Sequence, residues 1–464
     1  MSREINESYE FGKFRLDVGE HKLTRLSGPT NGSIPEKAFQ TLVHLVRNSG
    51  TLVTKNELLN TVWRDAFVEE NNLVKAIYAI RRFLEDMSES PLYVETVPKH
   101  GYRFVADVVR IGPSSPPKSA AADEERFGVP GRSPAYDLYL RGKVKVGNVK
   151  KDETEAAISL LEEAIAIDPS FAEALAQLAR AYIRMTFNFS DDADRNRLLE
   201  NAEVAIEGAL DLKPDLAEGH FARGLLLWTH TKGFAHDQAI LSYKRSLESN
   251  PNADETHHQL SMVYGHIGLL DEALQTVRKA IDINPNNTMA RFRVSNYLAW
   301  QCKFDEAISA LKTVPSEVSP FLVERIRAET YIKIGRLDDA ENIVDQYLKH
   351  HPTDEGASFT SVKALILAQR GQMKGAREAI GRSAKTGKGF GHFHHTAYNI
   401  ASAYAALNEP DDAVKWLEAA ADDGFPCYSY FEQDPNLDNL RAHSGFMDVM
   451  STMQKQWKKF KQLT

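Results

Sequence analysis

Prolines recur through the central part of the sequence, each just after an apolar segment with helical periodicity. The interval from Pro251 to Pro285 is 34 residues, and the other prolines that close such segments are Pro169, Pro214 and Pro352. Proline ends a helix because it has no amide hydrogen to donate and its ring clashes with the preceding turn. A period of roughly 20–50 residues is typical of repeat architectures, in which each unit buries its apolar face against its neighbours. The sequence therefore predicts a repeat array of helices over residues 134–423.

Small residues hold regular positions within these units. Gly268 opens a predicted turn between two helices, since glycine adopts backbone angles that other residues avoid. The pattern resembles the tetratricopeptide repeat, which implies about eight helix pairs here, stacked into a curved solenoid with a concave groove that binds a protein segment or peptide. An insertion is expected at residues 188–194. The matching positions are Leu260, Tyr264, Gly268, Ala273, Ala280 and Pro285, then Ala328, Tyr331, Gly335, Ala340 and Pro352, then Ala401, Tyr404, Ala413 and Ala420.

A second informative region lies near the N-terminus, at residues 71–84. Its apolar residues Leu73, Ile77, Ile80 and Leu84 follow helical spacing and share one face. The opposite face has no acidic residue, so it can approach a polyanion without repulsion. Asparagine and arginine are also the side chains that bond adenine and guanine edges in the major groove. The residues on that face are Asn72, Lys75, Tyr78, Ala79 and Arg82.

A β-hairpin is predicted soon after this helix. Residues 93–96 are β-rich and meet Phe104, Val105 and Val108 across a tight Pro/Gly turn. Lys99 and His100 lie at its tip, where they can contact phosphates. Upstream, residues 11–16 and 21–26 alternate like strands, and a third short strand is expected near Ile34. Two helices follow, one through Phe39 to Val46 and one that a capping box opens at Thr54–Glu57.

The order of strands, three helices and hairpin over residues 8–108 resembles the OmpR/PhoB-type winged-helix domain of bacterial transcriptional regulators. The motifs are Thr54–Leu58, Asn71–Ile77, Arg81–Leu84 and Val97–Phe104. The resemblance implies that the third helix enters the major groove and that the wing touches the adjacent minor groove. It also implies that the second helix meets phosphate with its N-terminus. Carried over, Asn72, Lys75, Tyr78 and Arg82 face the groove, Lys99, His100 and Arg103 lie on or near the wing, Lys55 contacts phosphate, and Trp63, Tyr102 and Phe104 belong to the core.

Two features depart from known branches of this family. Response regulators carry a phosphorylatable receiver before this domain, whereas here the domain begins near Met1, so no receiver is expected. CadC-like regulators carry a transmembrane helix behind it, but no apolar run approaches the roughly 20 residues that a span requires. No signal peptide is indicated.

Cys302 and Cys427 are far apart in sequence and indicate neither a disulfide framework nor a Cys-based zinc site. A soluble, cytoplasmic protein without a membrane partner is predicted.

Composition divides the chain. Residues 1–110 carry 15 Lys and Arg against 15 Asp and Glu, so the whole net charge of −8 lies downstream. Residues 111–133 are rich in Pro, Ser and Ala, which is typical of a flexible linker. The predicted domains are a winged helix at 1–110, this linker, a tetratricopeptide-like α-solenoid at 134–423, and a C-terminal segment at 424–464 that covers the apolar edge of the last repeat. The fold class is mainly α, with an α+β domain at the N-terminus.

Two further patterns invite metal or phosphate binding. His392-Phe393-His394-His395 and His257-His258 lack accompanying carboxylates and a regular ligand spacing, so no metal site is expected. Residues 381–389 have one residue too many between their glycines for a phosphate loop, and Gly389 replaces the Ser or Thr that holds magnesium. They are interpreted as a loop between repeats. No catalytic constellation stands out, so neither an enzyme nor a cofactor is predicted.

The sequence therefore favours a transcriptional regulator that binds double-stranded DNA through its winged helix and a partner or signal through its repeats. Candidate partners are RNA polymerase, a second copy of the chain on DNA, and an unknown protein or peptide in the groove. The acidic balance favours a basic ligand, although a merely solvated surface accounts for it equally well. The alternative is an interaction scaffold whose winged helix contacts protein rather than DNA. The neutral charge of residues 1–110 leaves this alternative open, because a nucleic-acid binder is commonly basic.

Overall fold

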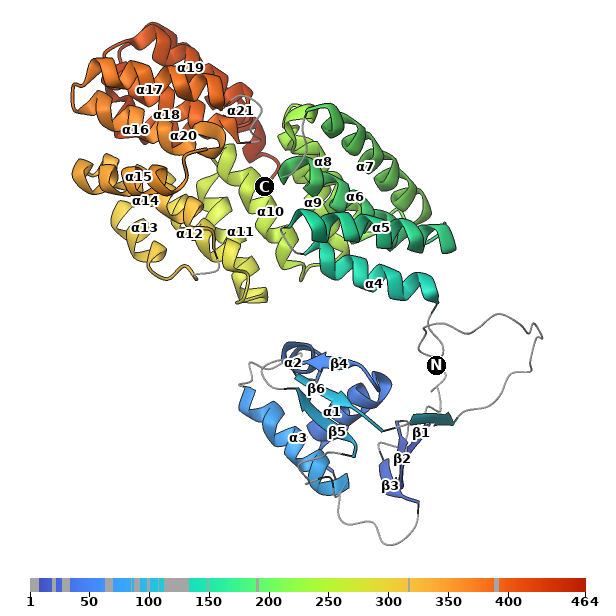
Figure 1. Ribbon diagram of the computed structural model, residues 1–464. Helices are drawn as coiled ribbons and strands as arrows, with labels where there is room; N and C mark the ends of the chain where they lie inside the picture. Colours follow the sequence, from blue (N-terminus) through green and yellow to red (C-terminus); the bar gives the residue numbers. More distant parts are fainter. Residues whose placement is uncertain are drawn as a thin grey trace. The chain divides into compact units, whose positions relative to one another are not determined.

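The computed structural model describes residues 8–18, 22–26, 34–62, 70–84, 86, 92–97, 101–106, 108–111, 133–147, 150–188, 192–315, 318–387 and 392–464. Contacts divide the chain into two compact units, residues 1–125 and 126–464 (Figure 1). Each unit has an apolar core of its own. Most of the predicted linker lies outside the described residues, as do Trp63, Lys99 and His100.

Two antiparallel sheets and three helices make up the described part of the first unit. One sheet has the strand order β3-β2-β1-β7 and the other the order β4-β6-β5. Helices α1 and α3 pack together and bury an aromatic and aliphatic core against the strands. The elements are β1 (Ser8–Phe11), β2 (Phe14–Asp17), β3 (Lys22–Arg25), α1 (Glu36–Arg47), β4 (Leu52–Thr54), α2 (Lys55–Val62), α3 (Glu70–Leu84), β5 (Val94–Val97), β6 (Gly101–Phe104) and β7 (Val108–Ile111).

The strands of this unit differ from the prediction in three places. The predicted strand at residues 11–16 is interrupted at Gly12, whose φ of +50° suits glycine and is rare for other residues. This turn separates β1 from β2. Ile34, where a third strand was expected, lies outside any strand, and β3 completes that edge of the sheet. Val108 belongs to β7 and pairs with β1 in the other sheet, so the wing hairpin consists of β5 and β6.

The second unit is a stack of helix pairs, as the prolines predict. Eight pairs, α4–α5 through α18–α19, lie among its described residues up to Asp422. The five prolines of the repeat pattern each lie two residues beyond the second helix of a pair. The helices are α4 (Pro134–Val146), α5 (Lys151–Ile167), α6 (Ala172–Asn188), α7 (Asp192–Leu212), α8 (Ala217–Leu227), α9 (His236–Ser249), α10 (Asp254–His266), α11 (Leu270–Ile283), α12 (Thr288–Trp300), α13 (Phe304–Leu311), α14 (Pro320–Lys333), α15 (Leu337–His350), α16 (Ser358–Gln369), α17 (Met373–Thr386), α18 (Phe393–Ala406) and α19 (Pro410–Asp422).

The turns inside the pairs reuse one backbone conformation. Gly268 and Gly335 have φ of +80° and +77°, which confirms the predicted role of the turn glycine. Cys302, Gly371 and Asn408 hold a positive φ at the same place in other pairs. The expected insertion at 188–194 lies partly outside the described residues. The expected loop at 381–389 is wrong in its first part, because α17 continues through it to residue 386.

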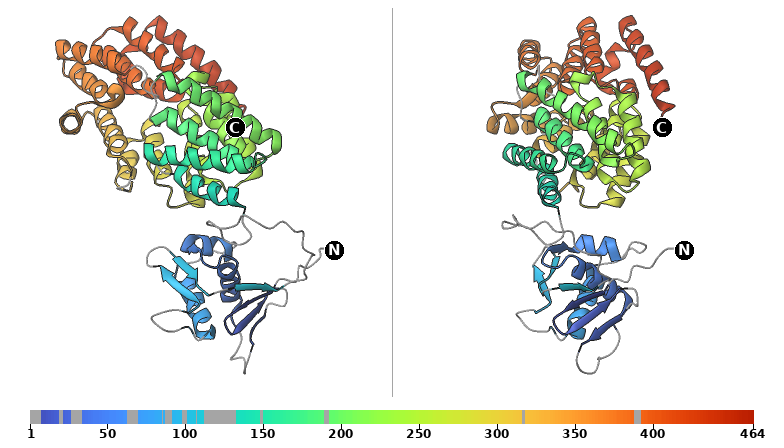
Figure 2. Two further views of the ribbon diagram at one scale, coloured as in Figure 1. Left: turned by 45° about the vertical axis from the view of Figure 1, so that its right-hand side comes forward. Right: turned by 90° about the vertical axis from the view of Figure 1, so that its right-hand side faces the viewer.

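The C-terminal segment does more than cover the last repeat. It forms α20 (Tyr428–Gln433), a 3-10 turn (Pro435–Leu440) and α21 (Ser444–Lys461), and α21 packs on α19 as expected. Its start, however, lies against an earlier repeat, with the Phe425 ring centroid 5.0 Å from that of Trp300. The Trp457 indole also donates to the carbonyl of Gly268, at 3.0 Å. The red C-terminal helices thus lie beside the green and yellow ones, and distant repeats share one core (Figure 2).

Candidate nucleic-acid interface

Helix α3 has one buried face and one exposed face. Leu73, Ile77 and Ile80 are at most 2% exposed and pack into the core of the first unit. Tyr78 is 55% exposed, and Arg82 is exposed as well. An exposed tyrosine presents both an apolar ring and a polar hydroxyl to a ligand. The predicted orientation of this helix is confirmed for these residues, whereas Ala79, which was expected on the exposed face, is partly buried and packs against the core.

Two of the predicted groove residues are placed only by their backbone. Asn72 and Lys75 lie on α3, at positions whose helical spacing puts them on the side of Tyr78 and Arg82. Their side chains, like Lys99 and His100 as a whole, fall outside the described residues. Their roles stay predictions.

The first turn of α2 has one of the two hydrogen bonds of the predicted capping box. The Thr54 hydroxyl accepts a hydrogen bond from the Glu57 amide at 3.1 Å, which fixes the helix start at Lys55. The Glu57 carboxylate lies 3.1 Å from Nε2 of His44 on α1. Lys55 is half-buried at this N-terminus, where amide groups and the helix dipole favour an anion.

Arg103 lies in β6, the central strand of the wing sheet. Its guanidinium donates to Glu95 on β5 at 3.1 Å, and both side chains are about 40% exposed. A phosphate contact by Arg103 therefore has to share this guanidinium with Glu95. The sequence did not indicate this pair, because cross-strand partners depend on the register of the hairpin.

Two residues outside the predicted set fix the wing to the recognition helix. Arg81 of α3 donates to the carbonyl of Val94 at 2.7 Å and to the Thr96 hydroxyl at 2.7 Å. Asp86 is 2% exposed, and its carboxylate accepts three backbone N–H bonds at 2.6–2.9 Å. These donors are the amides of Leu92, Tyr93 and Val94, where the chain enters β5.

No local pattern in the sequence distinguishes Asp86 from a solvated loop carboxylate. Its importance comes from burial and from three charge-assisted hydrogen bonds, which are stronger than neutral ones. Together with Arg81, it sets the angle between helix and wing. DNA binding that uses the helix and the wing together therefore depends on Arg81 and Asp86.

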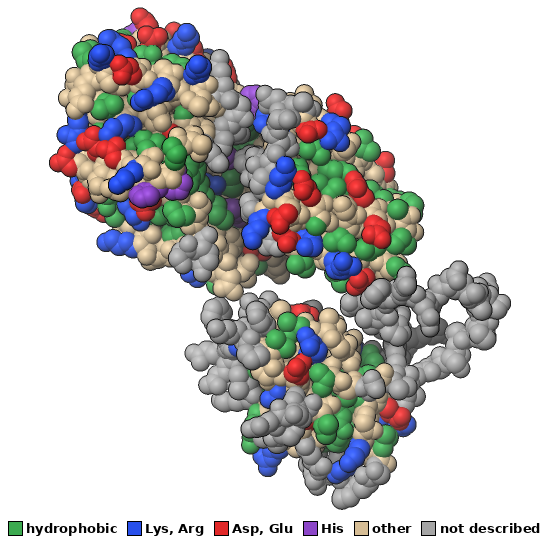
Figure 3. Space-filling model, in the orientation of Figure 1, with side chains coloured by type: hydrophobic (Ala, Val, Ile, Leu, Met, Phe, Trp, Pro, Cys, Tyr) green, Lys and Arg blue, Asp and Glu red, His purple; other side chains and the backbone are tan. Residues whose placement is uncertain are grey.

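A second candidate binding region lies among helices of the first four pairs. A cleft of about 180 Å³ is lined from α4, α6, α8, α9 and α10. Inside it, the Arg180 guanidinium stacks 4.7 Å from the Phe221 ring centroid and donates to Glu255 at 2.7 Å. Lys143 and Arg180 face Glu218, Asp254 and Glu255, and both signs of charge are interspersed over the face of this unit in Figure 3. The cleft therefore suits a segment of mixed charge better than a purely basic one.

Known protein families match segments of both units. The family "Transcriptional regulatory protein, C terminal" matches residues 30–104. Tetratricopeptide repeat families match residues 254–287, 327–390 and 394–422, and the plant-specific mitochondrial import receptor subunit TOM20 family matches residues 145–231. Among the described residues, no helix is long and apolar enough to cross a membrane.

Each of two curated relatives matches a part of this chain. Transcriptional regulator HilA of Salmonella typhimurium is 40% identical over 111 residues, which are 24% of this chain and 19% of HilA. Transcriptional activator CadC of Escherichia coli is 31% identical over 78 residues, 17% of this chain and 15% of CadC. The chain thus spans less than a fifth of either relative. A Rap protein, solved in complex with competence and sporulation factor, matches 70% of this chain and 99% of its own at 15% identity and a TM-score of 0.52, which shows a shared fold.

Proposed function

Because the chain carries an OmpR/PhoB-type winged-helix domain followed by tetratricopeptide repeats, we propose that it is a sequence-specific DNA-binding transcriptional regulator. The observation that carries the proposal is α3, which exposes Tyr78 and Arg82 opposite a fully buried apolar face. An exposed helix face beside a β-hairpin is the arrangement with which winged helices enter a groove. The relatives HilA and CadC, whose names describe transcriptional regulators, support the same interpretation.

In this proposal each contact has a stated task. Asn72, Lys75, Tyr78 and Arg82 face the major groove, and Arg82 pairs with a guanine edge. Lys99 and His100 reach the minor groove or its backbone, and Arg103 assists from β6. Lys55 and the free amides of the first α2 turn bind a phosphate. Phosphate contacts set position and affinity, whereas base contacts set sequence.

Replacing Lys99 with alanine is expected to weaken binding to many duplexes nearly equally. A lysine that neutralises one phosphate releases one counterion, so the slope of log affinity against log salt should fall by about 1. Fluorescence anisotropy at several salt concentrations measures both effects. A loss confined to one operator sequence, with the slope unchanged, would contradict the phosphate role.

The second candidate function is a protein-interaction scaffold. The observation that favours it is the neutral charge of residues 1–110, which supply no strong attraction to a polyanion. One simple test distinguishes a scaffold from a DNA-binding protein. It measures whether the first unit changes the electrophoretic mobility of duplex DNA, and how this change depends on salt. A scaffold gives no shift at physiological salt.

The repeats are the proposed partner-binding arm. RNA polymerase, a second copy of the chain, and a protein or peptide segment in the cleft of α4 to α10 are the partners that we propose. We place the activity in the cytoplasm, where bacterial DNA is accessible. A partner changes DNA occupancy only if it binds the free and DNA-bound forms differently, and the coupling is then reciprocal.

Removing the second unit is expected to give weaker and less cooperative DNA binding. The reason is that, in our proposal, the repeats bring two copies of the chain together on adjacent half-sites of the DNA. A fragment of residues 1–125 suits this test, since β7 extends to Ile111 and pairs with β1. Tighter binding by this fragment than by the full chain would indicate that the arm masks the recognition helix instead. Equal affinity and cooperativity would show that the arm acts only by recruiting a partner to the promoter.

A further inference from the structure

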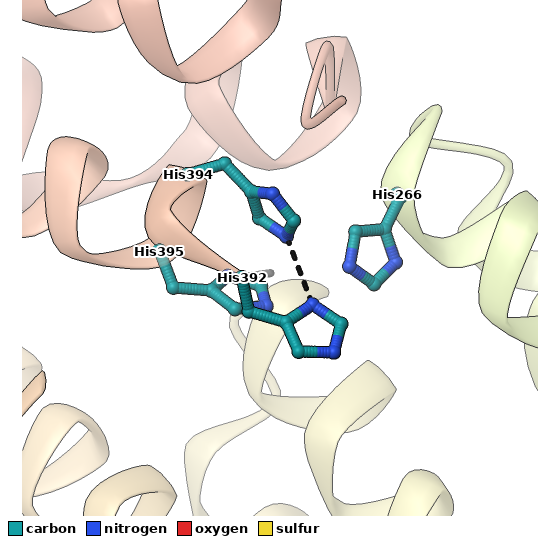
Figure 4. Close-up of side chains that lie close together, drawn as sticks. All are labelled: His266, His392, His394 and His395. Atoms are coloured by element: carbon teal, nitrogen blue, oxygen red, sulfur yellow. Dashed lines mark hydrogen bonds between the residues drawn. The ribbon is translucent and has the colours of Figure 1, made fainter. Parts of the chain in front are cut away.

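Four histidines from distant parts of the second unit meet in space. His266 ends α10, His392 directly precedes α18, and His394 and His395 lie in its first turn. One ring nitrogen from each lies within 4.8 Å of the others. Figure 4 shows the rings of His266, His392 and His394 turned toward a common space, with His395 beside them. This histidine cluster brings together ligands more than 120 positions apart in sequence.

Hydrogen bonds orient two of these rings for binding an ion. Nδ1 of His266 donates to the carbonyl of Met262 at 2.8 Å, and Nδ1 of His394 donates to the carbonyl of Asp423 at 2.8 Å. A carbonyl only accepts, so Nδ1 carries the proton in both rings and Nε2 presents a lone pair. Nε2 of His394 faces Nδ1 of His392 at 3.4 Å, the dashed line in Figure 4. Nε2 of His266 is buried without a hydrogen-bond partner. Such an orphaned acceptor is rare in folded proteins, and a donated Nδ1–H is typical of metal-bound histidine.

Burial keeps the rings of His266, His392 and His395 neutral. Burial lowers the pKa of all three well below its usual value. Neutral imidazole is the form that binds a metal ion. Aromatic side chains enclose the histidine cluster, with ring centroids of Trp228, Trp300 and Phe425 4.9–5.5 Å from that of His266.

Positive charge near the histidine cluster is offset by two carboxylates. The buried guanidiniums of Arg293 and Arg325 also lower the pKa of His392, and they repel a cation. Arg325 is paired with Glu329 at 3.0 Å. The Asp423 carboxylate lies 3.5 Å from Nδ1 of His394, and its Oδ2 is buried without accepting a hydrogen bond. A carboxylate behind a histidine in this way raises the basicity of a ligating imidazole.

We propose that His266, His392, His394 and His395 bind one divalent transition-metal ion, with Zn²⁺ as the first choice, and that the ion ties α10 to the start of α18. Four nitrogen ligands suit the four-coordinate sites of Zn²⁺, whereas Mg²⁺ and Ca²⁺ require oxygen ligands. Four protein ligands leave no open position for substrate, so the site is structural or sensory rather than catalytic. His392 and His395 are only half-buried, which gives the ion a route of entry. This site is independent of the proposed DNA binding.

The test uses the tag-free full chain, stripped with a chelator and titrated with Zn²⁺ against a chromophoric competitor. One Zn²⁺ per chain is expected. His266→Gln and His394→Gln should each weaken binding more than about 100-fold, beyond the roughly 10- to 100-fold loss expected for the outer residue in Asp423→Asn. His350→Gln is the matched control, because His350 also ends a helix and donates Nδ1–H to the carbonyl four residues before it, at 2.7 Å, yet lies exposed.

Binding of Co²⁺ to the wild-type chain tests the proposal even if a variant fails to fold. Wild-type protein with one equivalent of Co²⁺ should show the visible absorption of a tetrahedral site, and Zn²⁺ should abolish it and raise the melting temperature of the chain. Absence of a tetrahedral spectrum in the folded wild-type chain would overturn the proposal. Zn²⁺ affinity equal in His266→Gln, His394→Gln and His350→Gln would overturn it as well.

Discussion

The Arg82→Ala variant is expected to bind its operator about 1–3 kcal/mol more weakly than the wild type, or roughly 5- to 150-fold, with relaxed preference at one base pair. Arg82 is exposed on α3 and supports no part of the core, so the unfolding free energy should stay within about 0.5 kcal/mol of wild type. Lys75→Ala, two turns earlier along the same face, should behave similarly. Anisotropy titrations against operator and single-base variants measure both the affinity and the preference.

Lys22→Ala is the charge-matched control for that experiment. Lys22 is exposed on β3, in the sheet that does not contain the wing, and its replacement changes the net charge by the same amount. A loss equal to that of Arg82→Ala would mean that only general electrostatics is being measured. Unchanged affinity in both Arg82→Ala and Lys75→Ala would contradict the proposed orientation of α3.

The Asp86→Ala variant is expected to destabilise the first unit by about 3–5 kcal/mol. It leaves three backbone amides at the start of β5 without their acceptor, and each buried unpaired donor costs about 1–3 kcal/mol. Urea unfolding of residues 1–125 measures the loss. Asp86→Asn keeps an acceptor oxygen and should lose less.

The same variant separates stability from function. Because Asp86 and Arg81 join the wing to α3, a folded Asp86→Asn protein should bind DNA more weakly although no predicted contact residue is changed. A destabilisation of Asp86→Ala below about 1 kcal/mol would show that water replaces the carboxylate and that the wing needs no such anchor.

Local patterns in the sequence predicted the helix ends, turns and buried faces that depend on neighbouring residues. The prolines that follow five of the eight pairs and the glycines at positive φ act within one turn of chain, so their positions could be predicted directly. The apolar face of α3 followed from helical spacing alone. Gly12, by contrast, has the same flexibility as Gly268, yet the sequence around it reads as one strand because the aromatic residues on either side of it, Phe11 and Phe14, are β-favouring.

The features that were missed depend on contacts between distant residues. His392, His394 and His395 have no regular ligand spacing, and the fourth member of the histidine cluster, His266, comes from another repeat. Phe425 reaches Trp300 because the C-terminal segment returns to the middle of the array. Periodicity describes one element at a time and therefore carries no information about such meetings.

Equilibrium binding of residues 1–125 to duplexes recovered from genomic DNA by the full chain tests the central claim most directly. The proposed DNA reader predicts at least about 1,000-fold tighter binding to one recovered sequence than to shuffled duplexes of the same length and composition. It also predicts that affinity falls steeply as salt rises. Equal binding to recovered and shuffled duplexes, or no binding at physiological salt, would contradict the claim and favour the protein-interaction scaffold.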